Sequence, residues 1–201
     1  MTVIVKPLQD ITLGAVVTGI RIADIEEESW EQIYNAFLEF GVLIFPRQHL
    51  TEKEQNNFAR RFGETEQLSP LQNGPSVPIS NRKSDGALVQ PNDQGYKLLR
   101  GNEGWHTDST YMPLASKAAM LSAIEVPDRG GETEFADMRA AWDQLDLATQ
   151  KQLQQLSAYH SLYYSQERAG FKHKTDNIYG LHDKGAPLRP CLLYTSDAAD
   201  E

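Results

Sequence analysis

The stretch WHTDSTY at residues 105–111 carries the most information about the fold and its chemistry. His106 and Asp108 stand two positions apart, and side chains two apart on an extended segment point to the same side. An imidazole and a carboxylate placed in this way suit one face of an octahedral metal site. Non-haem iron(II) sites use two histidines and one carboxylate and leave positions open for small molecules. The stretch therefore predicts two of three protein ligands for a metal ion.

A second stretch, GGETEFADMRAA at residues 130–141, follows the first along the chain. The segment between them, residues 119–126, reads as a strand that is closed by Pro127 and the glycine turn, so the two stretches would flank one strand. Asp137 is an N-cap residue ahead of apolar positions at helical spacing. We expect a helix there, and a second one beginning at Asp146.

The N-terminal third alternates between apolar strands and capped helices. Two capping boxes, Ser29 with Gln32 and Thr51 with Glu54, predict helices that end at Gly41 and Gly63. Strands are predicted over residues 13–22 and, as a buried run, over 42–45. From residue 69 to about 97 the chain is polar and rich in Pro, Gly, Asn and Asp, with short strands expected only at 77–80 and 87–89. A long loop of this kind is often an active-site lid.

Composition limits the class of protein. The 201 residues are 40% hydrophobic and include three Trp and seven Phe, which is enough for the core of one globular domain. The net charge of -9 disfavours nucleic acid as a partner, because phosphate binding needs a clustered basic surface. No apolar run is long enough to span a bilayer, and the first residues lack the features of a signal peptide, so we expect a cytoplasmic protein.

The last residues, 191–201 (CLLYTSDAADE), follow Pro190 without obvious structural continuity. Reverse translation of this stretch gives a nucleotide sequence that resembles the transposon-end adapter used to prepare sequencing libraries. Segments of that origin are left out of fold reasoning. We therefore expect a single domain over residues 1–190 and an adapter artefact over 191–201. The alternative is an ordinary acidic tail. Without the tail the chain has no cysteine, so a metal must be bound through nitrogen and oxygen.

Four blocks in order, FGVLIF (40–45), FARRFG (58–63), WHTDSTY and GGETEFADMRAA, resemble the taurine and 2,4-dichlorophenoxyacetate dioxygenases, the TauD/TfdA family. The resemblance implies a mainly β fold with peripheral helices, a double-stranded β-helix or jelly roll, incomplete at the C-terminus here. It implies iron(II) as the metal and 2-oxoglutarate as cosubstrate. His106 and Asp108 match the first two iron ligands, and Thr133 matches the residue that hydrogen-bonds a 2-oxoglutarate carboxylate. Asn102 matches a substrate-pocket position.

The reaction implied by the resemblance uses dioxygen to hydroxylate a small organic substrate, while 2-oxoglutarate is converted to succinate and carbon dioxide. An anionic substrate is expected from the family alone, and Arg82, Lys97 and Arg100 are candidate bases near the expected lid. The distal His ligand and the Arg that binds 2-oxoglutarate have no match before Pro190. His160, His173 and His182 are alternatives for that distal ligand, although none has the expected sequence context.

Two readings compete with an enzyme. A metal-free binding module of the same fold would have no need for His106, Asp108 and Thr133 together. An inactive fragment that lacks the final strands would expose sheet edges and apolar faces. We therefore expect the 201-residue polypeptide itself to be poorly soluble, to bind iron(II) weakly and to be inactive. The residues do not fix an oligomeric state.

Overall fold

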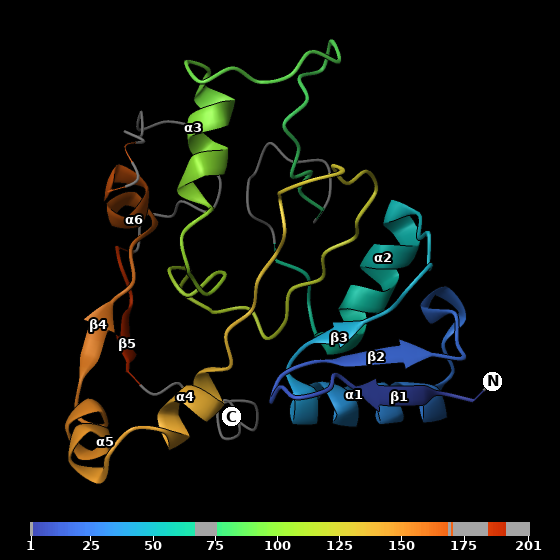
Figure 1. Ribbon diagram of the computed structural model, residues 1–201, viewed down its shortest axis with the longest axis horizontal. Helices are drawn as coiled ribbons and strands as arrows, with labels where there is room; N and C mark the ends of the chain where they lie inside the picture. The colour runs from blue at the N-terminus through green and yellow to red at the C-terminus, as the bar shows by residue number, and fades with distance from the viewer. Residues whose placement is uncertain (1, 67–75, 169, 171–184, 192–201) are drawn as a thin grey trace. The chain divides into compact units, whose positions relative to one another are not determined.

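The computed structural model describes residues 2–66, 76–168, 170 and 185–191 and contains two compact units (Figure 1). The first comprises Met1–Arg61 and Met120–Lys151, and the second comprises Phe62–Ala119 and Gln152–Glu201. Neither unit is one continuous stretch of chain. The single domain expected over residues 1–190 therefore stays a prediction, and most of the expected adapter tail lies outside the described residues.

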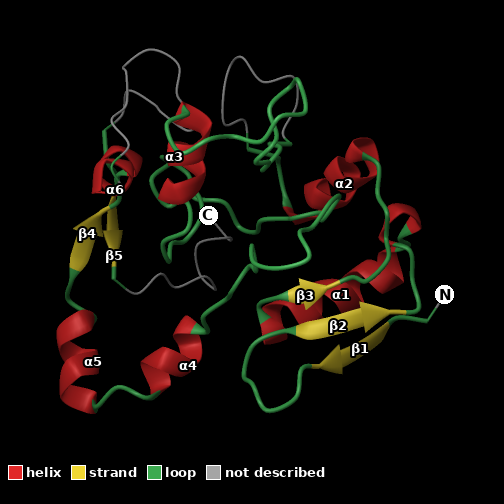
Figure 2. Ribbon diagram, turned by 45° about the horizontal axis from the view of Figure 1, so that its top comes forward, coloured by secondary structure: helices red, strands yellow, loops and turns green. Residues whose placement is uncertain are grey.

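A three-stranded sheet organises the first unit (Figure 2). Strand β1 (Ile4–Pro7) pairs antiparallel with β2 (Ala15–Thr18), and β2 pairs parallel with β3 (Leu43–Ile44). The strands predicted over 13–22 and 42–45 are confirmed in shorter form. Ile44 is 43% exposed, so the expectation of a buried third strand is wrong. The cause is the place of β3 at the end of the order β1-β2-β3, where no strand of the described residues lies beside its outer edge.

Helix α1 (Glu27–Phe40) lies along one face of this sheet (Figure 1). The capping box predicted at Ser29 is wrong, because the helix begins earlier and Ser29 is buried inside it. Glu27 and Glu28 occupy the first turn, where carboxylates interact favourably with the helix dipole. The predicted end at Gly41 is confirmed: this glycine has φ 68°, and its N–H bonds to the carbonyl of Phe37.

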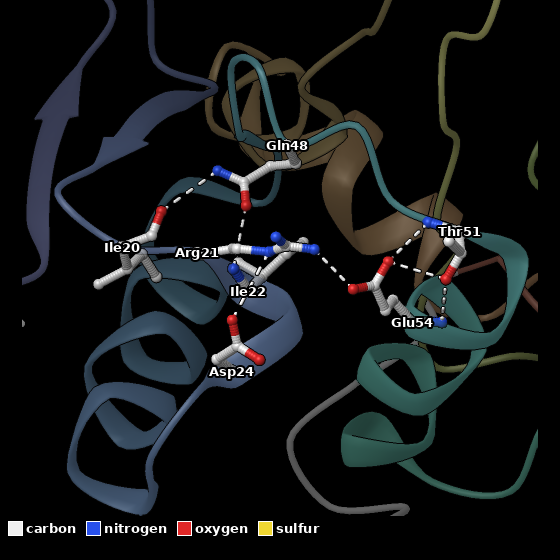
Figure 3. Close-up of polar contacts among 7 residues, drawn as sticks. All are labelled: Ile20, Arg21, Ile22, Asp24, Gln48, Thr51 and Glu54. Carbon is white, nitrogen blue, oxygen red and sulfur yellow. Dashed lines mark hydrogen bonds and ion pairs between the residues drawn. The ribbon is translucent and has the colours of Figure 1, made fainter.

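Helix α2 (Glu52–Ala59) begins with the predicted capping box. The backbone N–H and hydroxyl of Thr51 both lie 2.8 Å from Glu54 Oε2, and the N–H of Glu54 returns a bond to the Thr51 hydroxyl. Figure 3 shows this box joined to a wider network, because Arg21 forms an ion pair with Glu54 at 2.5 Å. Next to this ion pair, the side-chain amide of Gln48 hydrogen-bonds to the backbone carbonyl of Ile20 and to the backbone N–H of Ile22. Ile22 is the first residue of the short 3-10 helix η1 (Ile22–Asp24).

The apolar core of the first unit lies between the sheet and the two helices. Its most buried members are Ala15, Val17, Ile22, Ile33, Ala36 and Phe58. Phe58 stands edge-on to Trp30 and Phe45, with ring centroids 6.0 and 5.8 Å away. The chain then turns through η2 (Arg60–Phe62) and reaches the predicted stop at Gly63.

The return segment of this unit departs from the sequence prediction. Residues 119–126 form no strand, and Leu121, Ile124 and Val126 are 64%, 97% and 71% exposed. A strand needs a neighbour for its backbone hydrogen bonds, and no described segment pairs with this one. The predicted helices follow as α4 (Met138–Asp143), capped by Asp137, and α5 (Leu147–Leu153).

The second unit combines α3 (Gln94–Gly101), α6 (Leu162–Arg168) and a two-stranded ladder of β4 (Ser157–Tyr159) and β5 (Leu188–Pro190). The start of α3 lies inside the segment predicted as a loop, so that loop is shorter than expected. The short strands expected at 77–80 and 87–89 are wrong, because the described residues there form only an isolated bridge between Arg82 and Leu88.

In the described parts of the chain, more residues lie in helices than in strands, and the strands form two small sheets. The expected mainly β jelly roll is therefore not confirmed by these residues. None of the helices in the described residues has the length and apolarity that crossing a membrane requires.

Candidate functional site

His106 and Asp108 lie side by side in the second unit, as the sequence predicts. His106 Nε2 is 3.1 Å from Asp108 Oδ1. The other ring nitrogen, Nδ1, lies 2.7 Å from the carbonyl oxygen of Gly104. A carbonyl can only accept, so Nδ1 donates, and in the neutral ring Nε2 carries the lone pair. Both side chains are more than half exposed, so the pair is accessible.

This arrangement fits a divalent metal ion. A lone pair and a carboxylate oxygen that face each other repel unless a proton or a cation lies between them. Two neighbouring ligands of an octahedral ion, each about 2.1 Å from it and at a right angle, are roughly 3 Å apart. The separation of 3.1 Å agrees with that value. A metal-binding histidine also commonly donates its second ring N–H to a backbone carbonyl, as His106 does.

The two side chains are a partial site. In the part of the chain that the structure describes, no three His, Cys, Asp or Glu side chains gather in a way that could hold a metal. His160 is described and its backbone N–H bonds to the carbonyl of Pro187, whereas His173 and His182 lie outside the described residues. The third ligand therefore stays open.

The turn that follows Asp108 is buried and polar. Ser109 and Thr110 are 7% and 8% exposed, and Ser109 has φ 55°, a left-handed conformation that is unusual for a residue with a Cβ atom. The hydroxyl of Ser109 donates to Glu66 Oε2 at 2.6 Å. The guanidinium of Arg189 donates to the carbonyls of Thr110, Met112 and Pro113. The chain that leaves Asp108 is therefore fixed by two side chains distant in sequence.

Asn102 lies just beyond α3 and is held by α6. Gln166, which is 3% exposed, donates from Nε2 to Asn102 Oδ1 at 3.1 Å. Asn102 Oδ1 therefore accepts one hydrogen bond from α6, and the amide nitrogen of Asn102 can donate elsewhere. Gly101 makes room for this contact, since a Cβ atom at that position would lie 2.1 Å from Gln166 Oε1.

The other candidates are exposed. Arg100 forms an ion pair with Glu103, and Lys97 and Arg82 lie on the surface. Trp105, the residue before His106, is 71% exposed. Thr133 is exposed and belongs to the first unit, so its part in the site rests on the sequence resemblance.

The segment after Thr133 is anchored by Asp137. Burial alone raises the pKa of its carboxyl, but hydrogen bonds from Thr12 and from the N–H groups of Ala140 and Arg139 bring that pKa below the ordinary value. The Arg139 side chain donates to the carbonyls of Leu38 and Glu39 at the end of α1, both at 3.0 Å. The GGETEFADMRAA stretch is thus tied to α1 within its own unit.

Comparison with known proteins identifies the family. The sequence profile of the taurine catabolism dioxygenases, the TauD/TfdA family, matches residues 5–193. The chain belongs to this family. Over 194 residues it is 47% identical to the (S)-phenoxypropionate/alpha-ketoglutarate-dioxygenase of Sphingobium herbicidovorans, a match that covers 94% of the chain and 65% of the relative. It is 33% identical over 172 residues to the alpha-ketoglutarate-dependent 2,4-dichlorophenoxyacetate dioxygenase of Cupriavidus pinatubonensis, covering 80% and 58%.

A solved structure agrees with this identification. The crystal structure of AAD-2 in complex with Mn(II) and N-oxalylglycine superposes with a TM-score of 0.74 at 32% identity, over 88% of this chain and 62% of that one. The chain thus spans between 58% and 65% of the length of these three proteins. The resemblance predicted from four sequence blocks is confirmed.

The sequence does not predict three residues of the site: Glu66, Gln166 and Arg189. Each acts on the WHTDSTY stretch or on Asn102 across a long separation, such as the 43 residues between Glu66 and Ser109. Local patterns carry no signal for such contacts.

Proposed function

We propose that the complete protein is an iron(II)- and 2-oxoglutarate-dependent dioxygenase that hydroxylates a small, anionic aryloxy acid. The convergence of His106 Nε2 and Asp108 Oδ1, with Nδ1 turned to the Gly104 carbonyl, is the observation that carries this proposal. Membership of the TauD/TfdA family and the names of the relatives support the cosubstrate and the substrate class. We also propose the jelly roll of this family as the fold of the complete protein.

Each candidate residue has a separate task in this proposal. His106 and Asp108 would hold the iron, and the Gly104 carbonyl fixes the imidazole in the tautomer that leaves Nε2 free. The hydroxyl of Thr133 would donate to a carboxylate of 2-oxoglutarate. The amide nitrogen of Asn102 would donate to the substrate, while Oδ1 accepts from Gln166, which holds the side chain in place. These side chains bind and orient the reactants rather than act as acids or bases.

The overall reaction balances without another reductant. Held by His106 and Asp108, iron(II) would supply the oxidising chemistry by which one oxygen atom of dioxygen goes to 2-oxoglutarate and the other to the substrate. One oxygen atom enters succinate as carbon dioxide leaves, and the other enters the C–H bond next to the ether oxygen. The resulting hemiketal breaks its C–O bond and yields a phenol and a 2-oxo acid. From 2-phenoxypropionate the products would be phenol and pyruvate.

Turnover by the complete protein tests this proposal. We would incubate it with iron(II), 2-oxoglutarate, dioxygen and either the (S) or the (R) enantiomer of 2-phenoxypropionate, with phenoxyacetate and taurine as competing substrate classes. Phenol and succinate should appear in equal amounts from an aryloxy acid, and His106→Ala and Asp108→Ala should abolish both. Succinate coupled to taurine alone would contradict the substrate class.

The same assay separates the enzyme from the two competing readings. A metal-free binding module would bind an aryloxy acid equally well with and without Asp108→Ala and would form no succinate. The 201-residue polypeptide is still expected to be poorly soluble and inactive, and the exposure of Leu121, Ile124 and Val126 supports this. The cytoplasmic location and the exclusion of nucleic acid and membrane partners stay predictions from composition.

A further inference from the structure

We propose that Glu66 is a positioning residue that sets the geometry of Asp108 by holding Ser109. The inference rests on the proposed metal site and goes beyond it, because within the described residues Glu66 forms no hydrogen bond or ion pair with His106 or Asp108. It reaches the residue directly after Asp108, with its carboxylate 2.6 Å from the Ser109 hydroxyl.

Glu66 is only partly buried, yet one of its carboxylate oxygens is shielded from water. One carboxylate oxygen, Oε2, accepts the bond from Ser109, whereas the other, Oε1, is buried and has no hydrogen-bond partner among the described residues. A carboxylate removed from water normally has its oxygens satisfied. Within the part of the chain that the structure describes, Glu66 thus makes one hydrogen bond, to Ser109, and leaves its second carboxylate oxygen without a partner. This arrangement indicates that the main role of Glu66 is to position the Ser109 hydroxyl rather than to stabilise the fold.

Ser109 holds a backbone conformation that needs support. Its φ of 55° lies in the left-handed region, which residues with a Cβ atom avoid unless the surroundings enforce it. The conformation turns the chain sharply after Asp108, and the N–H of Met112 closes the turn onto the Ser109 carbonyl at 3.0 Å. Because this φ directly follows Asp108, loss of the turn would swing the Asp108 carboxylate away from His106 Nε2.

The burial pattern of the second unit agrees with this role. In its described parts the buried side chains are all polar: Ser109, Thr110 and Gln166. Two of them directly follow Asp108, and the third holds Asn102. Buried polar contacts in this unit are thus concentrated at the proposed site rather than spread through it.

Arg189 provides a matched control. It bonds to the carbonyls of Thr110, Met112 and Pro113, so it anchors the same segment but not Ser109 itself. Loss of Arg189 should weaken the packing of residues 110–113 and leave the hydrogen bond between Ser109 and Glu66 intact. A purely structural role for Glu66 would make the two variants behave alike.

Binding of Mn(II) to the complete protein, measured by calorimetry or by loss of the free-ion electron paramagnetic resonance signal, tests the inference without turnover. Removal of partners that orient metal ligands typically costs about 10- to 100-fold in metal affinity. Glu66→Ala and Ser109→Ala should each fall in that range, and the double variant should be no weaker than either single one. Glu66→Gln retains an acceptor for the hydroxyl and should bind within a few-fold of wild type.

Arg189→Ala should lower the melting temperature yet bind Mn(II) within a few-fold of wild type. If Glu66→Ala does not fold, Ser109→Ala carries the test, because it keeps the Cβ atom and removes only the hydroxyl that Glu66 accepts. Unchanged affinity in Glu66→Ala or in Ser109→Ala, or equal losses in Glu66→Ala and Arg189→Ala, would overturn the role of Glu66. A wild type that binds no Mn(II), or binds it equally after His106→Ala, would instead overturn the proposed metal site itself.

Discussion

Replacement of Gly101 by alanine tests the contact that holds Asn102. Gly101 ends α3, and a Cβ atom there would lie 2.1 Å from Gln166 Oε1 and 2.9 Å from its amide carbon. Gln166 is 3% exposed and bonded to Asn102, so its side chain cannot move aside without breaking that bond. The backbone of Gly101 has no positive φ, so alanine would be acceptable if the amide were absent.

The expected change in the free energy of unfolding follows from two destabilising effects and one stabilising effect. Overpacking of a filled site costs about 1–3 kcal/mol, and the loss of a buried hydrogen bond costs about 1 kcal/mol more. Alanine in a helix returns roughly 0.5–1 kcal/mol relative to glycine. We therefore expect Gly101→Ala to destabilise the complete protein by about 1–3 kcal/mol. In a Gln166→Ala background the clash is gone, and Gly101→Ala should become neutral or stabilising by up to about 1 kcal/mol.

Urea unfolding of the four proteins in this cycle measures both numbers and the coupling between the two sites. The sign change is the decisive observation, because helix propensity alone would make alanine favourable in both backgrounds. An equal effect of Gly101→Ala with and without Gln166 would refute the contact. Weaker substrate binding without loss of Mn(II) affinity in Gln166→Ala would further support its action through Asn102.

Three further predictions concern the first unit. Hydrogen bonds from the Thr51 backbone and hydroxyl, aided by Arg21, lower the pKa of Glu54 below its ordinary 4.5. The stability that this carboxylate contributes is therefore fully present above pH 4.5 and is lost as the pH falls through the lowered pKa. The urea midpoint of wild type should exceed that of Glu54→Gln near neutral pH, and the difference between the two midpoints should disappear in acid. Phe58→Ala should cost about 3–5 kcal/mol in the same assay, because the ring is 4% exposed, and a loss below 1 kcal/mol would contradict the core. Arg139→Lys should lower stability by about 1 kcal/mol, because a lysine cannot serve both carbonyls at the end of α1 with a planar fork; thermal melting equal to wild type would count against that contact.

Features set by neighbouring residues could be predicted from the sequence. The Thr51–Glu54 box, the Gly41 stop and the Asp137 cap each depend on groups within one helical turn, and all three form as expected. The pairing of His106 with Asp108 is likewise a two-residue relation. Ser29 marks the limit of such patterns, because its capping box competes with an equally good acidic start slightly earlier.

Features that depend on distant partners could not be predicted. Residues 119–126 have the composition of a strand, yet a strand forms only where another segment pairs with it. Glu66 and Arg189 gain their importance from contacts with the turn after Asp108, and neither lies in a recognisable motif. Helix α3 could not be predicted, because the Gly, Asn and Asp residues that precede it are typical of a loop.

The central claim is that His106 and Asp108 bind the iron of a 2-oxoglutarate-dependent dioxygenase. Its most direct test is the release of labelled carbon dioxide from 2-oxoglutarate labelled at C1, by the complete protein with iron(II), dioxygen and 2-phenoxypropionate. We expect release that requires iron(II) and the aryloxy acid and that disappears in Asp108→Ala. Carbon dioxide release that persists in Asp108→Ala, or none from a folded wild type across the aryloxy acids, would contradict the claim.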